Sequence, residues 1–378
     1  MSAATHDVAI IGLGAMGSAA AWQLARRGKS VIGFDRFRAP HQFGSSHGRS
    51  RIIREAYYEH PLYVPLVRSA LEQWKELERE SGRRLLRVTG GLMIGPPDGE
   101  LVAGSLQSAV AHAVPFERLD AAEVHRRFPI CHPPESHVAI FEPRAGILDP
   151  EGCIEAALER ARSLGAETHF GETIERWKAE KDAIALVTRT TTWRARRLII
   201  AAGPWVTEIA QLPTGMFEVE RQVAFWLQPN SSPEYFGPDA CPIWLWEHVP
   251  GHFVYGFPDL GDGVKLARHH DGETTTAALA HRAPRPGEEA ELRDILRPFI
   301  PAALGELRDA SVCLYTNTPD RHFIIDAHPT DSRVLIASAC SGHGFKFASA
   351  IGGVLAELAE DQVSSFDLSP FSVQRFRE

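Results

Sequence analysis

At 378 residues the chain is longer than one hydrophobic core usually serves, so two domains are expected. Hydrophobic residues make up 44% and charged residues 23%, the balance typical of a soluble globular protein. The formal net charge of −8 argues against non-specific binding to nucleic acid or anionic membrane, and no apolar stretch reaches the length of a membrane span. Because the first residues do not resemble a signal peptide, a cytoplasmic location is expected.

The N-terminal segment predicts a strand, a glycine-rich turn, a helix and a second strand. The continuous apolar run at residues 8–11 is typical of a parallel strand buried on both faces. Residues 12–17 read Gly-Leu-Gly-Ala-Met-Gly, and an alanine-rich helix is expected over residues 18–27. A second apolar strand at residues 30–34 stops at Asp35. This order is that of a dinucleotide-binding βαβ unit.

Each conserved feature of such a unit has a physical role. Gly12 permits a tight turn, Gly14 lets a pyrophosphate approach the backbone, and Gly17 lets the helix pack against the strand. The helix N-terminus supplies free N–H groups to the anion. Asp35 is expected to bind the adenosine ribose, and its charge disfavours the 2′-phosphate of NADP. The motif alone does not distinguish FAD from NAD.

Farther along, α/β segments surround a β-rich region. Helices are expected over residues 63–81, 121–127, 150–164, 288–297 and 352–360, strands over 88–95, 138–142, 195–202, 312–316, 323–326 and 334–338, and a loop over 36–60. Between residues 217 and 270, short aromatic-rich segments separated by Pro and Gly predict an antiparallel or mixed sheet. The sequence therefore predicts an α/β fold, α+β overall, in which a Rossmann-like domain is interleaved with a second, sheet-based domain.

The cysteines show neither a C-x-x-C motif nor another zinc-like pairing, so no metal site is expected. Two segments near the C-terminus carry candidate site residues instead. Residues 313–320 read Cys-Leu-Tyr-Thr-Asn-Thr-Pro-Asp, and residues 341–348 read Ser-Gly-His-Gly-Phe-Lys-Phe-Ala before the last helix. A turn with alternate glycines ahead of a helix offers N–H groups to an anionic or electron-rich group, and Lys346 adds a full charge. The run Ala202-Gly203-Pro204-Trp205 ends a buried strand, and by itself it is one more strand with a turn.

These segments resemble the monomeric sarcosine oxidase and N-methyltryptophan oxidase family, within the D-amino-acid-oxidase-like group. The resemblance covers nearly the whole chain and includes His47-Gly48, Arg-Ile-Ile-Arg at residues 51–54, Tyr-Gly-Phe-Pro at 255–258, Lys265-Leu266 with His269, and Phe-Asp-Leu-Ser-Pro-Phe at 366–371. It implies an FAD-binding domain of residues 1–90, 143–215 and 313–378. The substrate domain would comprise residues 91–142 and 216–312.

The resemblance also implies a role for individual residues. Cys313 matches the cysteine that joins FAD covalently through the flavin 8α-methyl carbon, which requires a thiolate. Lys265 matches the lysine that promotes the reaction of reduced flavin with O₂, although a lysine in an apolar strand more often points to solvent. Arg54 and Lys346 match the pair that clamps the substrate carboxylate. Without the resemblance, Arg54 would be a loop arginine paired with Glu55 or Glu59.

The remaining expected contacts form two sets. The catalytic and substrate-binding set is Lys265, Arg51, His269, Tyr255, Tyr315, Arg54 and Lys346, with Arg51 against the flavin face. The cofactor-binding set is Gly12, Gly14, Ala15, Met16, Gly17, Asp35, Arg36, Ser45, Ser46, Arg51, Ile52, Ala202, Gly203, Trp205, Cys313, Tyr315, Gly342, Gly344, Phe345 and Lys346.

The chain departs from the family in two places. Residues 46–50 read Ser-His-Gly-Arg-Ser where the family typically has His-His-Gly-Asp-Thr. Ser46 therefore cannot supply a ring contact, and Arg49 inverts a local charge. Trp244-Leu245-Trp246-Glu247 is bulkier than expected for a sarcosine pocket, unless these tryptophans lie in the core or on the surface.

The reaction implied is the two-electron oxidation of a secondary amino acid, such as sarcosine or N-methyltryptophan, to an imine. Hydrolysis would give the demethylated amino acid and formaldehyde, and O₂ would become H₂O₂. The alternatives are an oxidase of cyclic imino or glycated amino acids, a flavin dehydrogenase with another electron carrier, a non-catalytic flavoprotein, and an NAD-dependent dehydrogenase. The expected partners are a small amino acid and O₂, with no nucleic acid or membrane, and the family suggests a monomer.

Overall fold

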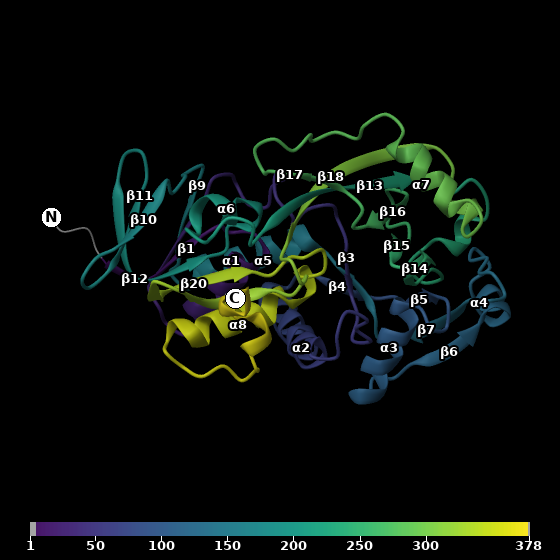
Figure 1. Cartoon of the computed structure of the whole chain (residues 1–378), viewed down its shortest axis with the longest axis horizontal. Coiled ribbons are helices and arrows are strands. Elements are labelled where there is room, and N and C mark those ends of the chain that lie inside the picture. Colours follow the sequence, from purple (N-terminus) through teal and green to yellow (C-terminus); the bar gives the residue numbers. More distant parts are fainter. Residues whose placement is uncertain (1–4, 377–378) are drawn as a thin grey trace.

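Two large β-sheets organise the chain, and they occupy opposite halves of the elongated molecule (Figure 1). The computed structural model describes residues 5–376. The first sheet runs in the order β10 (Arg176–Ala179), β11 (Ile184–Val187), β12 (Thr192–Ile200), β1 (Thr5–Ile11), β2 (Val31–Asp35) and β9 (Glu167–Phe170), and β20 (Asp331–Ser338) joins β12 and β19 (Ile324–His328). Strands β9, β2, β1, β12 and β20 are parallel, as expected for a Rossmann-like sheet.

The second sheet is mostly antiparallel. Its order is β17 (Glu273–Thr275), β13 (Glu218–Leu227), β16 (Val264–His269), β15 (His252–Phe257), β14 (Ile243–Val249), β5 (Gly91–Gly95), β7 (Val138–Glu142) and β6 (Glu117–Asp120), with β18 (Leu307–Asn317) beside β13. A third, small sheet consists of β3 (Arg51–Ile53), β8 (Gly146–Leu148) and β4 (Leu86–Val88). The mixed second sheet confirms the predicted fold class.

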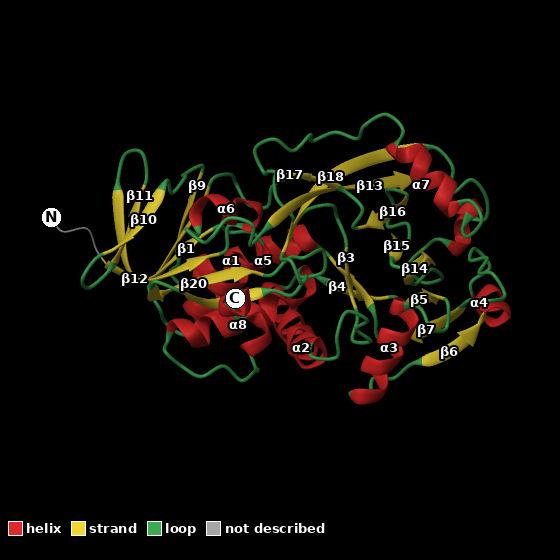
Figure 2. Cartoon of the chain, viewed as in Figure 1, coloured by secondary structure: helices red, strands yellow, loops and turns green. Residues whose placement is uncertain are grey.

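Helices gather in two places (Figure 2). Four of them, α1 (Ala15–Arg26), α2 (Tyr63–Ser81), α5 (Pro150–Ser163) and α8 (Ala348–Ala359), form a layer next to the first sheet. In this layer α1 and α8 approach closely. Gly352 permits this approach, since a Cβ at that position would lie 2.6 Å from the Ala19 carbonyl carbon. The others, α3 (Glu100–Ala111), α4 (Ala121–Arg127) and α7 (Glu288–Leu296), flank the second sheet, and the short α6 (Val206–Ile209) follows β12.

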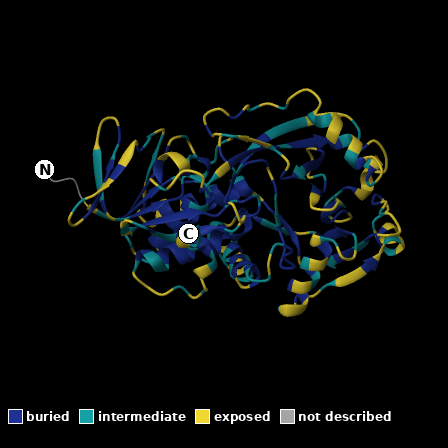
Figure 3. Ribbon diagram, in the orientation of Figure 1, coloured by how far each residue is buried: buried dark blue, intermediate teal, exposed yellow. Residues whose placement is uncertain are grey.

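Burial is densest in the middle of the molecule, and exposed residues concentrate on the outer helices and loops (Figure 3). The largest core cluster joins strands of the first sheet to its helix layer, and a separate cluster fills the space behind the second sheet. No helix among residues 5–376 combines the length and the apolar character needed to cross a membrane.

Most predicted elements are confirmed, and several of the differences occur at glycines. Helices α2 and α4 and strand β7 span the predicted residues. The prediction of one continuous strand over residues 88–95 was wrong, because a turn at Gly90, where φ is +73°, separates β4 from β5. Helix α8 begins at Ala348, four residues before the predicted start, because Gly352 and Gly353 lie within the helix at close packing contacts.

Two further boundaries differ from the prediction. Helix α1 begins at Ala15, inside the glycine motif, since Gly14 already serves as its N-cap. The segment predicted as a loop over residues 36–60 contains β3, which pairs with β8.

Candidate active site

A cavity of about 400 Å³ is lined by residues of both large sheets. Every residue of the two predicted site sets borders this cavity except Gly17. A Cβ on Gly17 would lie 1.8 Å from the carbonyl oxygen of Gly12, so this glycine instead allows the helix to pack against the turn. No cluster of residues that could hold a metal ion occurs in the part of the chain that the structure describes.

The glycine turn has a crowded side and an open side. Gly12 has φ +90°, and a Cβ there would lie 2.4 Å from the carbonyl oxygen of Ala201. At Gly14, a Cβ would meet nothing closer than the Ser46 hydroxyl, at 3.7 Å. Gly14 provides no side-chain cap to the α1 N-terminus, and the N–H of Ala15 makes only a long hydrogen bond to the Ser46 hydroxyl, at 3.4 Å. Open space above the helix N-terminus fits the pyrophosphate of a dinucleotide.

Asp35 stabilises the same turn from the end of β2. Its carboxylate accepts hydrogen bonds from the backbone N–H of Leu13 at 2.8 Å and of Phe37 at 2.9 Å. The side chain is 7% exposed and borders the cavity. Asp35 therefore has a structural role beside the predicted contact with ribose.

Cys313, on β18, lies among positively polarised groups. Its Sγ is 3.5 Å from Nε2 of His47 and 3.7 Å from Nη2 of Arg51. Burial raises the pKa of this thiol, but His47, Arg51 and Lys265 outweigh that effect and lower the pKa of Cys313 to about 6. Burial raises the pKa of the four other cysteines, and at Cys340 the opposing hydrogen bonds and Arg51 do not outweigh it. Cys313 is therefore the cysteine suited to nucleophilic attachment.

Lys265 is buried, at 3% exposure, although it belongs to the apolar strand β16. Its ammonium donates to the carbonyls of Gly48 at 2.7 Å and Ser50 at 3.0 Å, and to the Ser50 hydroxyl at 3.2 Å. Burial and the nearby Arg51 hold the pKa of Lys265 well below its ordinary value. The side chain borders the cavity instead of pointing to solvent.

Two further cations, Arg54 and Lys346, lie buried on the cavity wall. Arg54 pairs with Glu59 at 2.7 Å. The ion pair expected from the sequence alone is therefore present, and Arg54 also borders the cavity. Lys346 donates to the His343 carbonyl at 2.6 Å and to the Tyr57 hydroxyl at 3.3 Å. Burial and the charge of Arg54 lower the pKa of Lys346 to about 7. Nε of Arg54 and one oxygen of Glu59 are buried without a hydrogen-bond partner.

Three neutral polar side chains complete this end of the cavity. Nδ1 of His269 lies 3.3 Å from the Tyr315 hydroxyl, and the Tyr255 ring packs edge-on against His269 with centroids 6.2 Å apart. Burial, assisted by the neighbouring His270, lowers the pKa of His269 well below its ordinary value. Burial raises the pKa of both tyrosines. All three groups are therefore uncharged at neutral pH.

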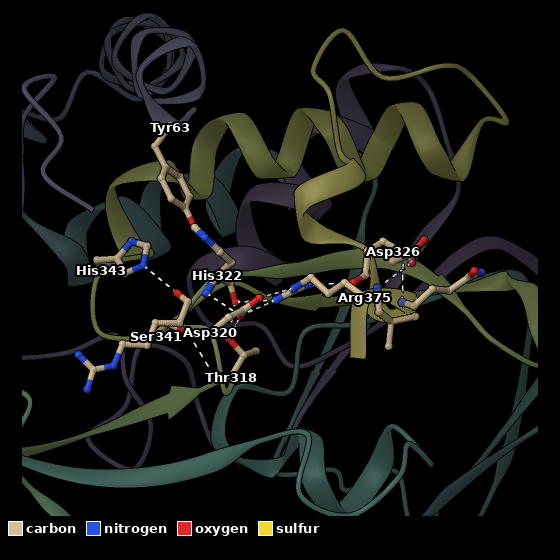
Figure 4. A network of polar contacts seen from close by, with 12 residues as sticks. Tyr63, Thr318, Asp320, His322, Asp326, Ser341, His343 and Arg375 are labelled. Carbon is tan, nitrogen blue, oxygen red and sulfur yellow. Dashed lines mark hydrogen bonds and ion pairs between the residues drawn. The ribbon is translucent and has the colours of Figure 1, made fainter. Parts of the chain in front are cut away.

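A polar network holds His343 in place (Figure 4). Nδ1 of His343 lies 2.6 Å from the Tyr57 hydroxyl, and Nε2 lies 3.2 Å from the Arg321 carbonyl. The loop that carries Arg321 is held by Asp320, whose carboxylate accepts from Arg375 at 2.7 and 3.0 Å. Because burial lowers the pKa of His343 to about 3, the ring is neutral, and donation to the Arg321 carbonyl places its proton on Nε2.

The tryptophans at residues 244–247 lie in the core. Trp244 and Trp246 are at most 1% exposed within the cluster behind the second sheet, and Trp246 donates to His137 at 3.2 Å. Leu245, between them on β14, borders the cavity. Because side chains alternate along a strand, Trp244 and Trp246 point into the core and only Leu245 faces the cavity, where it forms an aliphatic wall.

The sequence did not single out several residues on the cavity wall, among them His47, Glu59, Phe257, Trp226 and His343. His47 and His343 lie inside motifs that were recognised, so their position was an available signal. Phe257 likewise lies in the Tyr-Gly-Phe-Pro motif, and Glu59 was expected only as an ion-pair partner of Arg54. Trp226 carried no comparable signal, because a strand aromatic is ordinary in sequence.

The family model for FAD dependent oxidoreductases (DAO) matches residues 7–358, so the chain belongs to that family. It is 40% identical over 375 residues to a monomeric sarcosine oxidase of Streptomyces avermitilis, with 98% of both chains covered. It is 34% identical to an N-methyl-L-tryptophan oxidase of Yersinia pestis, covering 98% of this chain and all of that one. These matches confirm the predicted family.

Solved structures show the same fold. NikD, described as an unusual amino acid oxidase essential for nikkomycin biosynthesis, matches with a TM-score of 0.84 at 24% identity, over 97% of both chains. The L-proline dehydrogenase from P. horikoshii matches with a TM-score of 0.85 at 21% identity, over 98% of both chains.

Proposed function

We propose that this protein is an FAD-dependent oxidase of secondary amino acids, in particular N-methyl amino acids such as sarcosine or N-methyltryptophan. The products would be the demethylated amino acid, formaldehyde and H₂O₂. The observation that carries the proposal is the presence, on one cavity, of an open dinucleotide turn at Gly14, a reactive Cys313 and the buried cations Arg54 and Lys346. Relatives named sarcosine oxidase and N-methyl-L-tryptophan oxidase, at 34–40% identity, support the same conclusion.

The cations supply selectivity for an amino acid over a simple amine. Arg54 offers a planar fork of donors and Lys346 a point charge, and together they bind a carboxylate. Glu59 holds Arg54 in place until the carboxylate arrives and shares its charge. The pKa of Lys346 would rise once a carboxylate lies beside it, because an opposite charge favours the ammonium form.

The uncharged wall then orients the amine. His269, Tyr255 and Tyr315 can accept or donate hydrogen bonds without adding charge, so the neutral form of the amine is favoured beside the buried cations. Leu245 and Phe257 exclude water from the same end of the cavity.

We further propose that FAD is held covalently by Cys313, with its diphosphate at the α1 N-terminus. Bound FAD supplies the acceptor for the two electrons of the substrate. Lys265 lies within the same group of side chains as Arg51 and Cys313, and its cation would stabilise negative charge as O₂ is reduced. The backbone carbonyls of Gly48 and Ser50 fix that cation before the reaction, so little reorganisation is needed.

The test is anaerobic bleaching of the bound flavin by a panel of sarcosine, N-methyltryptophan, proline, pipecolate and glycated amino acids. Bleaching by an N-methyl amino acid, followed in air by one H₂O₂ for each O₂ consumed, is the expected result. Bleaching by proline, pipecolate or a glycated amino acid alone would assign the alternative substrates. Bleaching without peroxide would indicate a dehydrogenase, and no bleaching at all would contradict the proposal.

A further inference from the structure

One indole ring contacts both the buried Lys265 and an arginine at the surface. Trp226 on β13 is the register partner of Lys265 on β16, and the lysine Nζ lies 5.3 Å from its ring centroid. The guanidinium carbon of Arg49 lies 4.7 Å from the same centroid. Trp226 is 3% exposed, whereas the Arg49 side chain is 44% exposed. The indole is therefore in contact with both cations, one buried and one partly exposed.

Arg49 is held in this position from several sides. Its guanidinium pairs with Asp262 at 3.3 Å and with Asp309. Its backbone N–H, with that of Gly48, donates to the carboxylate of Glu151 at the start of α5. Its φ is +66°, a conformation that costs energy for a residue other than glycine. A strained residue with this many restraints has a defined position.

The backbone of the same loop binds Lys265 on its inner side. The carbonyls of Gly48 and Ser50, which flank Arg49 in sequence, accept the hydrogen bonds of the lysine ammonium. A change in the backbone at Arg49 would therefore also move the acceptors of Lys265. Phe257, the partner of Lys265 on β15, closes the other side, with its ring centroid 4.8 Å from Nζ.

We propose that Arg49 and Trp226 form a cap that excludes water from Lys265 and fixes the position of its ammonium. Both are positioning residues for the reaction with O₂, since they act through the lysine. The effect of a cation on developing negative charge is larger where water is excluded, which gives the cap its value. The proposal rests on the proposed function in one respect, the assignment of Lys265 to the O₂ step.

The first test measures how accessible Lys265 is in the native holoenzyme. The protein is treated with acetic anhydride, and acetylation of Lys265 is followed by peptide mass spectrometry. Arg49→Ala should increase the acetylation rate by about fivefold or more, because it removes both a cation–π contact and the anchor of the loop. Trp226→Phe, a smaller change in the core, should increase it less.

Arg26→Ala is the matched control. The guanidinium of Arg26 also lies over a tryptophan, 5.0 Å from the ring of Trp22, and it also pairs with two carboxylates, Glu76 and Glu80. Its partner Trp22 does not border the cavity, whereas Trp226, the partner of Arg49, does. Acetylation of Lys265 should therefore match the wild type in this variant.

The second test separates the two halves of the reaction by stopped flow. In Arg49→Ala the rate of reoxidation by O₂ should fall by about fivefold, while anaerobic reduction by substrate changes less than about twofold. Unchanged acetylation of Lys265 in both Arg49→Ala and Trp226→Phe would overturn the cap. Faster acetylation with normal reoxidation would overturn its role in the O₂ step. Acetylation needs no turnover, so it tests the cap even if no amino acid reduces the flavin.

Discussion

Single residues at the cavity combine burial with charge, and Cys313 shows this most directly. Its pKa of about 6 means that the thiolate predominates at neutral pH. In protein produced in riboflavin-limited cells, alkylation of Cys313 by iodoacetamide should increase with pH through a midpoint near 6. Peptide mass spectrometry across pH 4–9 measures this, with buried Cys153 as the internal control, whose pKa is raised by burial. A midpoint near the ordinary cysteine value would contradict the electrostatic role of His47 and Arg51.

Covalent attachment can be tested separately. Cys313→Ser should leave FAD bound but release it on acid precipitation, whereas the wild type stays yellow in the pellet. Flavin that remains in the Cys313→Ser pellet would contradict the assignment of the link to this residue.

The buried Lys346 should lower the free energy of unfolding, although it contributes to the proposed binding of the substrate carboxylate. Because its folded pKa, about 7, lies below that of the unfolded chain, unfolding takes up a proton between these values. The cost is therefore fully present below pH 7 and is lost as the pH rises toward the ordinary lysine pKa. Lys346→Met should raise the free energy of unfolding at pH 6 by about 1 kcal/mol or more, and by less at pH 9. Calorimetry at both pH values measures this, with exposed Lys178→Met as the control.

The same variant should bind substrate poorly. We expect a large increase in KM, because one of the two carboxylate ligands is lost. A variant that is stabilised yet keeps a normal KM would contradict the proposed clamp.

At this scale the sequence predicted the residues that belong to recognisable motifs. Cys313, Lys265 and Arg54 were assigned through the resemblance, not from their immediate neighbours in the chain. Trp226 was not predicted, and Glu59 was predicted only as an ion-pair partner of Arg54, because their positions on the cavity depend on contacts formed in space. The inward position of Lys265 could not be derived from its apolar strand, since only its acceptors at Gly48 and Ser50 explain it.

Among the elements, the turn between β1 and α1 contains two glycines with different expected roles. Gly17 is needed for folding, and Gly14 is needed for binding FAD. Gly17→Ala would place a Cβ 1.8 Å from the Gly12 carbonyl oxygen and should destabilise the protein by several kcal/mol or prevent folding. Gly14→Ala meets no protein atom closer than 3.7 Å, so it should fold normally but lose FAD affinity. Thermal unfolding and flavin content of purified protein distinguish the two. Normal FAD binding by Gly14→Ala would contradict the proposed diphosphate site.

Elements were predicted best where one periodic pattern covers the whole segment. Helix α2 has an amphipathic repeat and ends at Gly82, which adopts a left-handed φ of +68°, so its limits were readable. Helix α3 and the β10–β11 hairpin were not foreseen, because their short segments lack a strong pattern. The pairing of β5 with both β7 and β14 depends on contacts between distant residues, and local sequence does not specify it.

Across the whole molecule, the C-terminal segment is tied to the loop that carries Asp320 and Arg321 (Figure 4). Arg375 binds Asp320, and the carbonyl of Arg321, the residue after Asp320, accepts a hydrogen bond from Nε2 of His343. Arg375→Ala should therefore raise KM about two- to fivefold, as expected for an ion pair whose side chains are 16% and 36% exposed, with little change in reoxidation by O₂. Steady-state kinetics compared with stopped-flow reoxidation measure this. An equal loss in both half-reactions would indicate general destabilisation instead.

The overall class and family were predicted from sequence, whereas the arrangement of the two sheets was not. The division into an FAD-binding and a substrate domain and the monomeric state stay predictions, which limited proteolysis and sedimentation would test.

The first sheet also has a consequence for the order of events during synthesis. Its adjacent parallel strands β1, β12 and β20 come from residues 5–11, 192–200 and 331–338. The ribosome therefore releases the glycine turn long before the strands and the Gly342–Lys346 segment that close the site around it. A nascent chain cannot retain FAD through the complete site until residues 331–346 have emerged, so the proposed attachment to Cys313 is expected only after that point in synthesis.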